Sequence, residues 1–323
     1  MQPMLDLRRP GQSAITTQRK EKDIVEIISG VFRGYTTGAP ITMIIWNKDK
    51  KSKDYDNLQN NLRPGHADYP AMIKYKKFND YRGGGRFSGR LTATHVMGGA
   101  VARKLLQEIS IKVYSYTTQI GKTQIRSTPL IITPKMIFSN DTRCPNKADA
   151  KKMYQEIISA RKSGDTLGGI IESVTTDLPV GMGEPIFGSL ESELSAAIYS
   201  IPSVKGVEFG SGFDGSEKRG TENNDLYIKK GKNIKTSTNN SGGILGGLSI
   251  GMPLKMRIAF KPVSSVAQKQ KTVNIKTGKS ATLHIKGRHD PCVVPRAVPV
   301  VDALVSLVLA DHALIGGFIK QVL

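Results

Sequence analysis

The stretch Arg63-Pro64-Gly65-His66-Ala67-Asp68, followed by Arg82-Gly83-Gly84-Gly85-Arg86, decides how the middle of this chain must fold. Proline and glycine just before His66 predict a loop rather than a helical face. The glycine triplet predicts a tight turn, and the apolar spacing after it predicts a helix from Ser88 to about Ile109, with Ser88 as its N-cap. The stretch therefore predicts a basic loop at a helix start, where backbone N–H groups and arginines meet an anion.

Two simpler interpretations of this stretch stay open. Three adjacent glycines can form no more than a flexible turn, and a lone histidine is more often structural than catalytic. Because Arg82, Arg86 and Arg90 surround the turn, phosphate binding is favoured. An imidazole among bound anions is a competent acid near neutral pH, which makes His66 a candidate catalytic residue.

The order of the remaining elements predicts an α+β protein. Strands are expected at residues 23–32, 41–46, 168–175, 205–209 and 255–260, with a hairpin at 272–285 that turns at Gly278. Further helices are expected at 148–162, 190–200 and about 299–309. Because strands and helices come in mixed order, α+β is favoured over a doubly wound sheet. One domain over residues 1–323 is expected, with a long polar loop at about 210–243.

Composition and charge limit the class of protein. The chain has 323 residues, an apolar fraction of 38% and a net charge of +20, so it can bury a core and should bind anionic partners. Cys144 and Cys292 fit neither a disulfide framework nor a zinc site, which favours a reducing cytoplasm and no metal. No secretory signal pattern opens the sequence. Pro299, Asp302 and Asp311 interrupt the apolar segment 297–319, which favours a buried core helix over a membrane span.

Three clusters in the second half of the chain also carry chemistry. Arg288-His289-Asp290-Pro291 combines a guanidinium, an imidazole and a carboxylate, and its spacing leaves open whether Asp290 is catalytic or only pairs with Arg288. The segment 239–247 is rich in glycine, and 261–265 adds small hydroxyls. Both let a flat ring or a phosphate approach the backbone closely, and both are compatible with a simple turn.

These clusters occur together with Arg8-Arg9-Pro10-Gly11-Gln12-Ser13, Ser29-Gly30-Val31-Phe32 and Val204-Lys205-Gly206-Val207-Glu208. In order and spacing, over almost the whole chain, the set resembles the chorismate synthase family. The resemblance implies a sandwich of antiparallel sheets and helices. It also implies the last step of the shikimate pathway, the 1,4-anti elimination of phosphate from 5-enolpyruvylshikimate 3-phosphate to give chorismate. Reduced FMN (FMNH2) is the implied cofactor, NADPH a candidate reductant, and a cytoplasmic homotetramer the implied assembly.

The resemblance implies roles for individual residues. His66 would protonate or stabilise the reduced flavin, and Asp290 would assist proton removal. The substrate or an NADP phosphate would be bound by Arg8, Arg19, Arg63 and Arg90. The positions that match FMN contacts are Arg86, Phe87, Ser88, Pro202, Ser203, Gly246, Lys261, Pro262, Val263, Ser264, Ser265 and Arg288.

The sequence departs from the family pattern in several places. The family has a strand and a Gly-Glu-Ser-His-Gly segment that would lie upstream of Met1, so we expect an N-terminally incomplete member with severely reduced turnover. Phe87 stands where serine is common, and Asp302 where glutamate is usual. Two alternatives follow: a catalytically impaired FMN-binding remnant, and a basic nucleic-acid-binding protein. An aromatic content of 6% and the lack of a nucleic-acid-binding motif in the sequence count against the latter.

Overall fold

The centre of the fold is an antiparallel sheet of five strands in the order β6-β5-β7-β14-β9. The computed structural model describes residues 1–19, 21–49, 55, 57–129, 131–285 and 289–320. The strands are β5 (Lys112–Ile120), β6 (Thr123–Gln124), β7 (Gly169–Thr176), β9 (Val204–Phe209) and β14 (Leu254–Phe260). Ser115 on β5 pairs with Ser173 on β7, and Glu172 pairs with Arg257 on β14. Since side chains alternate along a strand, these two sets lie on opposite faces of the sheet.

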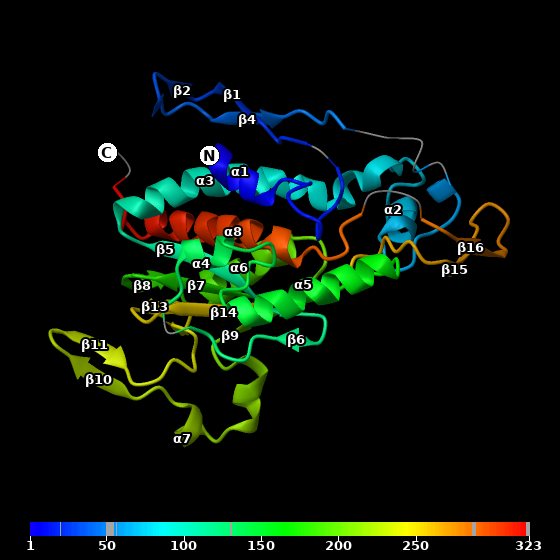
Figure 1. The fold of residues 1–323 in the computed structure, drawn as a ribbon. Helices are drawn as coiled ribbons and strands as arrows, with labels where there is room; N and C mark the ends of the chain where they lie inside the picture. Colours follow the sequence, from blue (N-terminus) through cyan, green and yellow to red (C-terminus); the bar gives the residue numbers. More distant parts are fainter. Residues whose placement is uncertain (20, 50–54, 56, 130, 286–288, 321–323) are drawn as a thin grey trace.

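Two long helices cover one face of this sheet (Figure 1). The helix α8 (Val294–Ile315) packs on β5 and β7, and α3 (Thr92–Glu108) packs on α8. The two helices approach closely, because a Cβ added to Gly99 would lie 2.4 Å from Cα of Ala303. The short helix α1 (Gln2–Arg8) lies against both. The end of α1 therefore meets the starts of α3 and α8, three places far apart in the sequence.

The helix α8 is a core element. By length and composition alone it could cross a membrane, but 72% of its most apolar stretch is buried inside the protein, as expected for a core helix. The predicted bounds of about 299–309 were wrong, because the helix already begins at Val294. Pro295 lies in the first turn, where the missing N–H has no helical acceptor. Pro299 lies inside the helix, where burial of the apolar surface outweighs the lost hydrogen bond.

Three shorter helices flank the sheet, and each begins at a polar side chain that caps its first turn. The predictions of helices at 148–162 and 190–200 are confirmed as α5 (Lys147–Lys162) and α6 (Leu190–Tyr199). Asn146 accepts hydrogen bonds from the first turn of α5, and Ser189 does the same for α6. Thr133 caps α4 (Pro134–Phe138).

Smaller sheets and turns surround this core. The two early strands are confirmed as an antiparallel ribbon that extends across the top of Figure 1, and the hairpin at 272–285 is also confirmed. The ribbons pair β1 (Val25–Ser29) with β4 (Thr42–Ile45), β2 (Val31–Phe32) with β3 (Tyr35–Thr36), β10 (Tyr227–Lys230) with β11 (Asn233–Thr236), and β15 (Gln270–Val273) with β16 (Ser280–Leu283). A three-stranded sheet joins β12 (Ile244–Leu245), β13 (Leu248–Ile250) and β8 (Val180–Gly183).

Two other expectations need correction. Ser88 does not cap α3: it caps the 3-10 turn η3 (Gly89–Leu91), and the preceding glycine turn is the 3-10 helix η2 (Arg82–Phe87). The carbonyl groups of Gly89 and Arg90 accept hydrogen bonds from Arg8, which fixes this turn at the start of α3.

The loop predicted at about 210–243 is also not structureless. It contains η5 (Gly212–Glu217), α7 (Gly220–Asn223) and the β10–β11 ribbon. The Asp225 carboxylate accepts hydrogen bonds from Thr238, Asn240 and Ser241, which ties the two ends of the ribbon together.

Candidate active site

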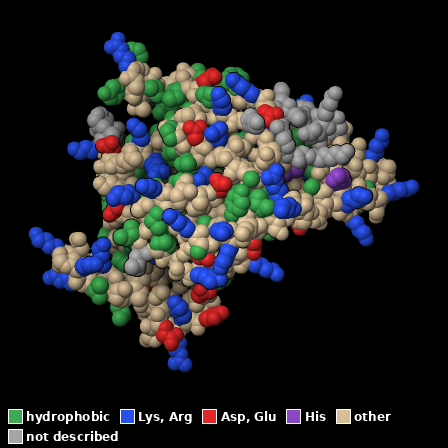
Figure 2. Space-filling view, viewed as in Figure 1, with side chains coloured by type: hydrophobic (Ala, Val, Ile, Leu, Met, Phe, Trp, Pro, Cys, Tyr) green, Lys and Arg blue, Asp and Glu red, His purple; other side chains and the backbone are tan. Residues whose placement is uncertain are grey.

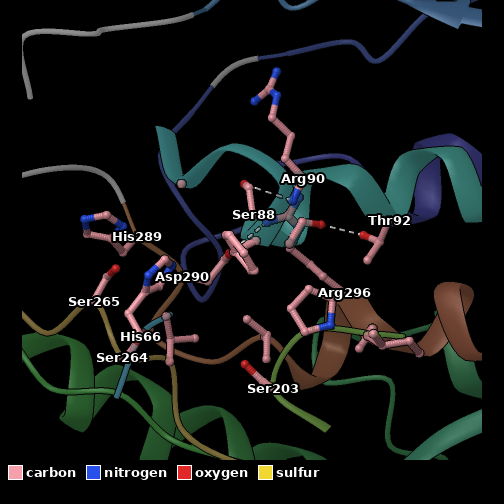
Figure 3. Close-up of a pocket in the computed structure, with 18 of the residues that line it drawn as sticks. His66, Ser88, Arg90, Thr92, Ser203, Ser264, Ser265, His289, Asp290 and Arg296 are labelled. Carbon is pink, nitrogen blue, oxygen red and sulfur yellow. Dashed lines mark hydrogen bonds and ion pairs between the residues drawn. The ribbon is translucent and has the colours of Figure 1, made fainter. Parts of the chain in front are cut away.

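A cavity of about 230 Å³ lies where α1, α3 and α8 meet. It is large enough for a small-molecule ligand rather than a single water molecule. Figure 3 shows side chains from five parts of the chain around it. These parts are the end of α1 with the following loop, the loop around His66, the turns η2 and η3, the loops after α6 and β14, and the segment that leads into α8.

Most of the residues predicted from the sequence line this cavity. They are Arg8, Arg19, Arg63, His66, Phe87, Ser88, Arg90, Pro202, Ser203, Val263, Ser264, Ser265 and Asp290. Arg86 lines a neighbouring cavity of about 300 Å³, which shares Arg63, His66, Gly84 and Phe87 with the first. Gly246 lies in the exposed turn between β12 and β13, outside the residues that line either cavity. Arg288 lies outside the described residues.

Lys261 and Pro262 act from behind the cavity wall. The Lys261 backbone N–H donates to the Ser203 carbonyl at 2.8 Å, and its Nζ donates to the Gly65 carbonyl at 2.6 Å. This lysine therefore fastens together three loops that the sequence had suggested separately. Ser203 has a backbone φ of 79°, which is uncommon for a residue other than glycine and typical of strained functional sites.

One side of the cavity is formed by His66 and the two charged residues beside it. His66 Nδ1 lies 2.6 Å from Asp68 Oδ1, and the Arg63 guanidinium contacts both oxygens of Asp68, at 2.6 and 2.8 Å. Burial alone would raise the pKa of Asp68, but hydrogen bonds from Arg63 and His66 outweigh it and hold that pKa well below its usual range. Asp68 is therefore a fixed negative charge beside the histidine.

The opposite side of the cavity contains Asp290 and a residue that we did not predict, Arg296. Arg296 Nη1 donates to Asp290 Oδ2 at 2.5 Å, and the Thr17 backbone N–H donates to Asp290 Oδ1 at 2.8 Å. Arg296 Nε also donates to the Arg8 carbonyl at 3.0 Å. The described partner of Asp290 is thus an arginine on the first turns of α8. The nearness of Arg296 to Asp290 in the sequence was the available signal.

Arg8 is buried and uses its guanidinium within the protein. It donates to Asp23 at 3.0 Å, to the Thr92 hydroxyl, and to the Gly89 and Arg90 carbonyl groups. Burial, followed by the charge of Arg296, lowers the pKa of Arg8 to about 10, while Asp23 opposes this, so Arg8 remains charged at neutral pH. This arginine fastens α1 to the start of α3.

Arg19 and Arg90 lie at the rim of the cavity and share one acidic partner. Arg90 forms an ion pair with Glu21, and Arg19 Nη2 lies 3.6 Å from the same carboxylate and 2.5 Å from the Asp49 carbonyl. Their side chains remain 22% and 25% exposed, so both can also reach a ligand. The rim therefore keeps a net positive charge, which favours anionic ligands.

The rest of the wall is suited to a flat ring. Hydroxyls of Ser88, Ser203, Ser264 and Ser265 line the cavity from different sides (Figure 3). The apolar part is formed by Ile201, Phe260, Val263, Val293, Ala297 and Val300. A thiol nucleophile is excluded, because burial raises the pKa of the nearby Cys292 to about 12.

On the face that Figure 2 shows, the surface charge does not gather at one place, because Lys and Arg side chains are spread over the whole visible face. This face therefore has no concentrated basic patch of the kind that binds a long polyanion.

Fold and cavity together define a class: an α+β protein with an arginine-lined cavity, suited to an anionic small molecule, and with a histidine and an aspartate on its walls. Comparison with known proteins gives the family. A sequence profile described as "Chorismate synthase" matches residues 1–314. A protein named chorismate synthase from Dehalococcoides mccartyi (strain BAV1) is 50% identical over 99% of this chain and 88% of its own length. The protein of that name from Methanocaldococcus jannaschii is 48% identical over 99% of this chain and 88% of its own length.

A solved structure agrees with this assignment. The crystal structure titled "Crystal Structure of Chorismate Synthase" superposes with a TM-score of 0.71 at 27% identity, over 98% of this chain and 82% of that chain. The chain belongs to the chorismate synthase family. The predicted α+β architecture of antiparallel sheets and helices is confirmed.

Proposed function

We propose that this protein is a lyase that eliminates phosphate from 5-enolpyruvylshikimate 3-phosphate to give chorismate, with reduced FMN bound in the cavity. In this reaction the C–O bond to phosphate breaks and C6 loses a proton. The electron pair of that C–H bond shifts through the ring double bond toward the carbon that phosphate leaves. The observation that carries the proposal is the meeting of His66, Asp290 and the rim arginines at one cavity in a member of this family.

The residues of the wall fit a flavin. Apolar side chains of Ile201, Phe260 and Val300 in the lining suit a flat ring, and the serine hydroxyls in the same lining suit its polar edge. A Cβ added to Gly65 would lie 3.4 Å from Ser264 Cβ, so the loops that would hold the ring are already packed together. When bound, reduced FMN would supply electron density that helps the phosphate to leave.

Side chains of this chain would do the remaining work. Arg19 and Arg90, at the rim, would bind phosphate and carboxylate groups, and each charge-assisted contact contributes roughly 1.5–3 kcal/mol. Asp290 would take up the proton that leaves the substrate, since Arg296 and the Thr17 N–H hold its carboxylate at the wall. His66 would take up a proton at Nε2, at the edge of the cavity, and return it.

The test is anaerobic conversion of the substrate with chemically reduced FMN. Phosphate and chorismate should appear together in a 1:1 ratio, as expected for a single elimination. FMN binding, followed by quenching of flavin fluorescence, separates two failures. Binding without product would support the impaired FMN-binding remnant, and neither binding nor product would refute the proposal.

The assembly, compartment and reductant are part of the same proposal. A cytoplasmic homotetramer is expected from the family resemblance, and sedimentation equilibrium would measure the mass of the assembly. NADPH oxidation in the presence of FMN would show whether the protein reduces its own flavin.

A further inference from the structure

The ring of His66 is held on one side by a compact ion pair. Asp68 Oδ2 accepts hydrogen bonds from Arg63 Nε at 2.8 Å and from the Arg63 backbone N–H at 3.0 Å. Asp68 Oδ1 lies 2.6 Å from both Arg63 Nη2 and His66 Nδ1. The three side chains are only 5%, 15% and 16% exposed for Arg63, Asp68 and His66, so water competes little for these contacts.

These distances decide which nitrogen of His66 carries the proton. Arg63 Nη2 is also 3.0 Å from His66 Nδ1, so arginine and aspartate both compete for that nitrogen. If Arg63 donated to a bare Nδ1, the lone pairs of Nδ1 and Asp68 Oδ1 would face each other at 2.6 Å, which is repulsive. If Nδ1 carries the hydrogen, His66 and Arg63 both donate to the same carboxylate oxygen, and these two hydrogen bonds to a charged acceptor outweigh the contact of the two donors with each other. The neutral ring is therefore the Nδ1–H tautomer.

The other ring nitrogen faces the cavity. Among the described residues, His66 Nε2 has no hydrogen-bond partner. A Cβ added to Gly84 would lie 3.7 Å from Nε2 and 3.7 Å from Ser88 Cβ, so the glycine keeps this side of the ring open. Gly84 has a φ of 78°, which also disfavours a side chain there. In the Nδ1–H tautomer, Nε2 has a free lone pair that can receive a proton and return it.

We propose that Asp68 is a positioning residue that fixes the Nδ1–H tautomer of His66 and so directs Nε2 at the bound ligands, and that Arg63 serves to hold Asp68. This inference rests on the proposed function, in which His66 manages a proton at the cavity. It gives Arg63 a role different from the phosphate contact that the family resemblance implied. Two of its guanidinium nitrogens, Nε and Nη2, are already directed at Asp68.

The substitution Asp68→Asn tests the proposal, because the amide must choose an orientation. Its oxygen should take the Oδ2 position, where Arg63 provides two donors, which places the NH2 group against His66 Nδ1. The amide would then donate to Nδ1 and move the ring proton to Nε2. A wrong tautomer of this kind severely reduces turnover in Ser-His-Asp enzymes when their aspartate is changed to asparagine.

The first measurement is ¹⁵N NMR of the histidine rings in the full chain, with His66→Ala to assign the signal. The expected result is Nδ1–H in the wild type and Nε2–H in Asp68→Asn. An Nε2–H ring in the wild type, or an unchanged tautomer in the variant, would overturn the proposal. The wild-type reading needs no variant other than His66→Ala for the assignment and no turnover, so it stands even if the proposed reaction fails.

The second measurement is the steady-state kinetics with reduced FMN. Asp68→Asn should lower kcat by about 100-fold or more, with KM changed by less than about threefold, because ligand contacts are preserved. The matched control is Asp80→Asn, which breaks the exposed Asp80–Arg82 pair on the same arm of the chain without touching His66. The control should keep both tautomer and kcat. An equal loss of kcat in the two variants would overturn the proposal.

Discussion

Carboxylates at the cavity wall and the carboxylate beneath α8 have opposite environments: the former are paired with arginines, and the latter is buried without such a partner in the part of the chain that the structure describes. At the cavity, Asp68 pairs with Arg63, Asp290 with Arg296, and Glu21 with Arg90. Beneath α8, Asp302 is 3% exposed and faces the sheet beside Ser115, and its Oδ1 has no hydrogen-bond partner among the described residues.

The consequence is a difference in charge state. Hydrogen bonds from Arg63 and His66 overcome the effect of burial and keep the pKa of Asp68 low, whereas burial raises the pKa of Asp302 to about 7 against the opposing effects of Ser115 and Arg103. The protein thus holds a fixed negative charge on Asp68 at the cavity wall and, in its core, a carboxyl group that is mostly protonated below pH 7. Substitutions on each side can test this contrast.

The largest effect is expected on the cavity side, from Asp290→Asn. The amide keeps the shape of the carboxylate but cannot take up a proton, so turnover with reduced FMN should fall by about 100- to 10,000-fold. Flavin binding should persist, because the fold around the site is retained. The assay is the anaerobic release of phosphate and chorismate. Turnover within about threefold of the wild type would show that Asp290 is only the ion-pair partner of Arg296.

The core side is tested by Asp302→Asn. Because the pKa of Asp302 is raised in the folded state, its contribution to stability is complete below the unfolded pKa near 4 and is lost as pH rises to about 7. Asparagine removes this loss. The variant should therefore gain free energy of unfolding relative to the wild type between pH 4 and 7, by about 2–4 kcal/mol at most. Urea unfolding at several pH values measures it.

The matched control for Asp302 is Asp311→Asn, an exposed residue on the same helix. Its stability difference from the wild type should stay constant over the same pH range. A flat difference for Asp302→Asn would mean that the carboxylate is ionised in the core at low pH, and the contrast with the cavity wall would be lost.

Two adjacent glycines on α3 test how tightly α8 is held over this core. A Cβ on Gly99 would lie 2.4 Å from both Cα and Cβ of Ala303, so Gly99→Ala should lower the free energy of unfolding by about 1–3 kcal/mol. A Cβ on Gly98 would meet only Leu307, at 3.5 Å, so Gly98→Ala should be neutral or stabilise by up to about 1 kcal/mol through helix propensity. Urea midpoints measure both. Equal destabilisation would contradict the close approach at Gly99.

The sequence predicted which residues line the cavity better than it predicted the ion pairs that these residues form. Arginine and histidine beside glycine or proline marked the loop at 63–68 and the segment at 288–291, because these residues need an irregular backbone. The sequence alone could not show that Arg8 forms an ion pair with Asp23, or that Arg90 forms one with Glu21. Those pairs form only when the folded chain brings α1 to the start of α3. Arg296 was missed because Pro295 and Pro299, which usually lie outside the interior of a helix, made the start of α8 hard to predict from the sequence.

The same difference holds for the fold, where some strands were predicted from the sequence and one central strand was not. The strand β7 was predictable from its Val and Ile content, and β14 was predicted as well, but the central strand β5 was missed. Its sequence, Lys-Val-Tyr-Ser-Tyr-Thr-Thr-Gln-Ile, lacks a clear alternation of apolar and polar residues, because both faces are covered and the buried Ser115 and Thr117 read as polar. Local patterns report burial only where the core is apolar, and beneath α8 it is not.

The smallest effect is expected on the stability of the protein, from the charge of Asp68, and it disappears in acid. Because the pKa of Asp68 is depressed in the folded state, its stabilising effect is present above the unfolded pKa near 4 and is lost as pH falls below it, which is the opposite sign to Asp302. The free energy by which the wild type exceeds Asp68→Asn should be about 1 kcal/mol at pH 6, after allowance for solvent screening, and should shrink toward pH 3. Urea unfolding at both pH values measures this difference.

The matched control is Asp80→Asn. The ion pair of Asp80 with Arg82 is exposed, so this variant should show no measurable change over the same pH range. A difference for Asp68→Asn that stayed constant with pH would show that the contacts of Arg63 stabilise the loop by shape alone and not by the charge of Asp68.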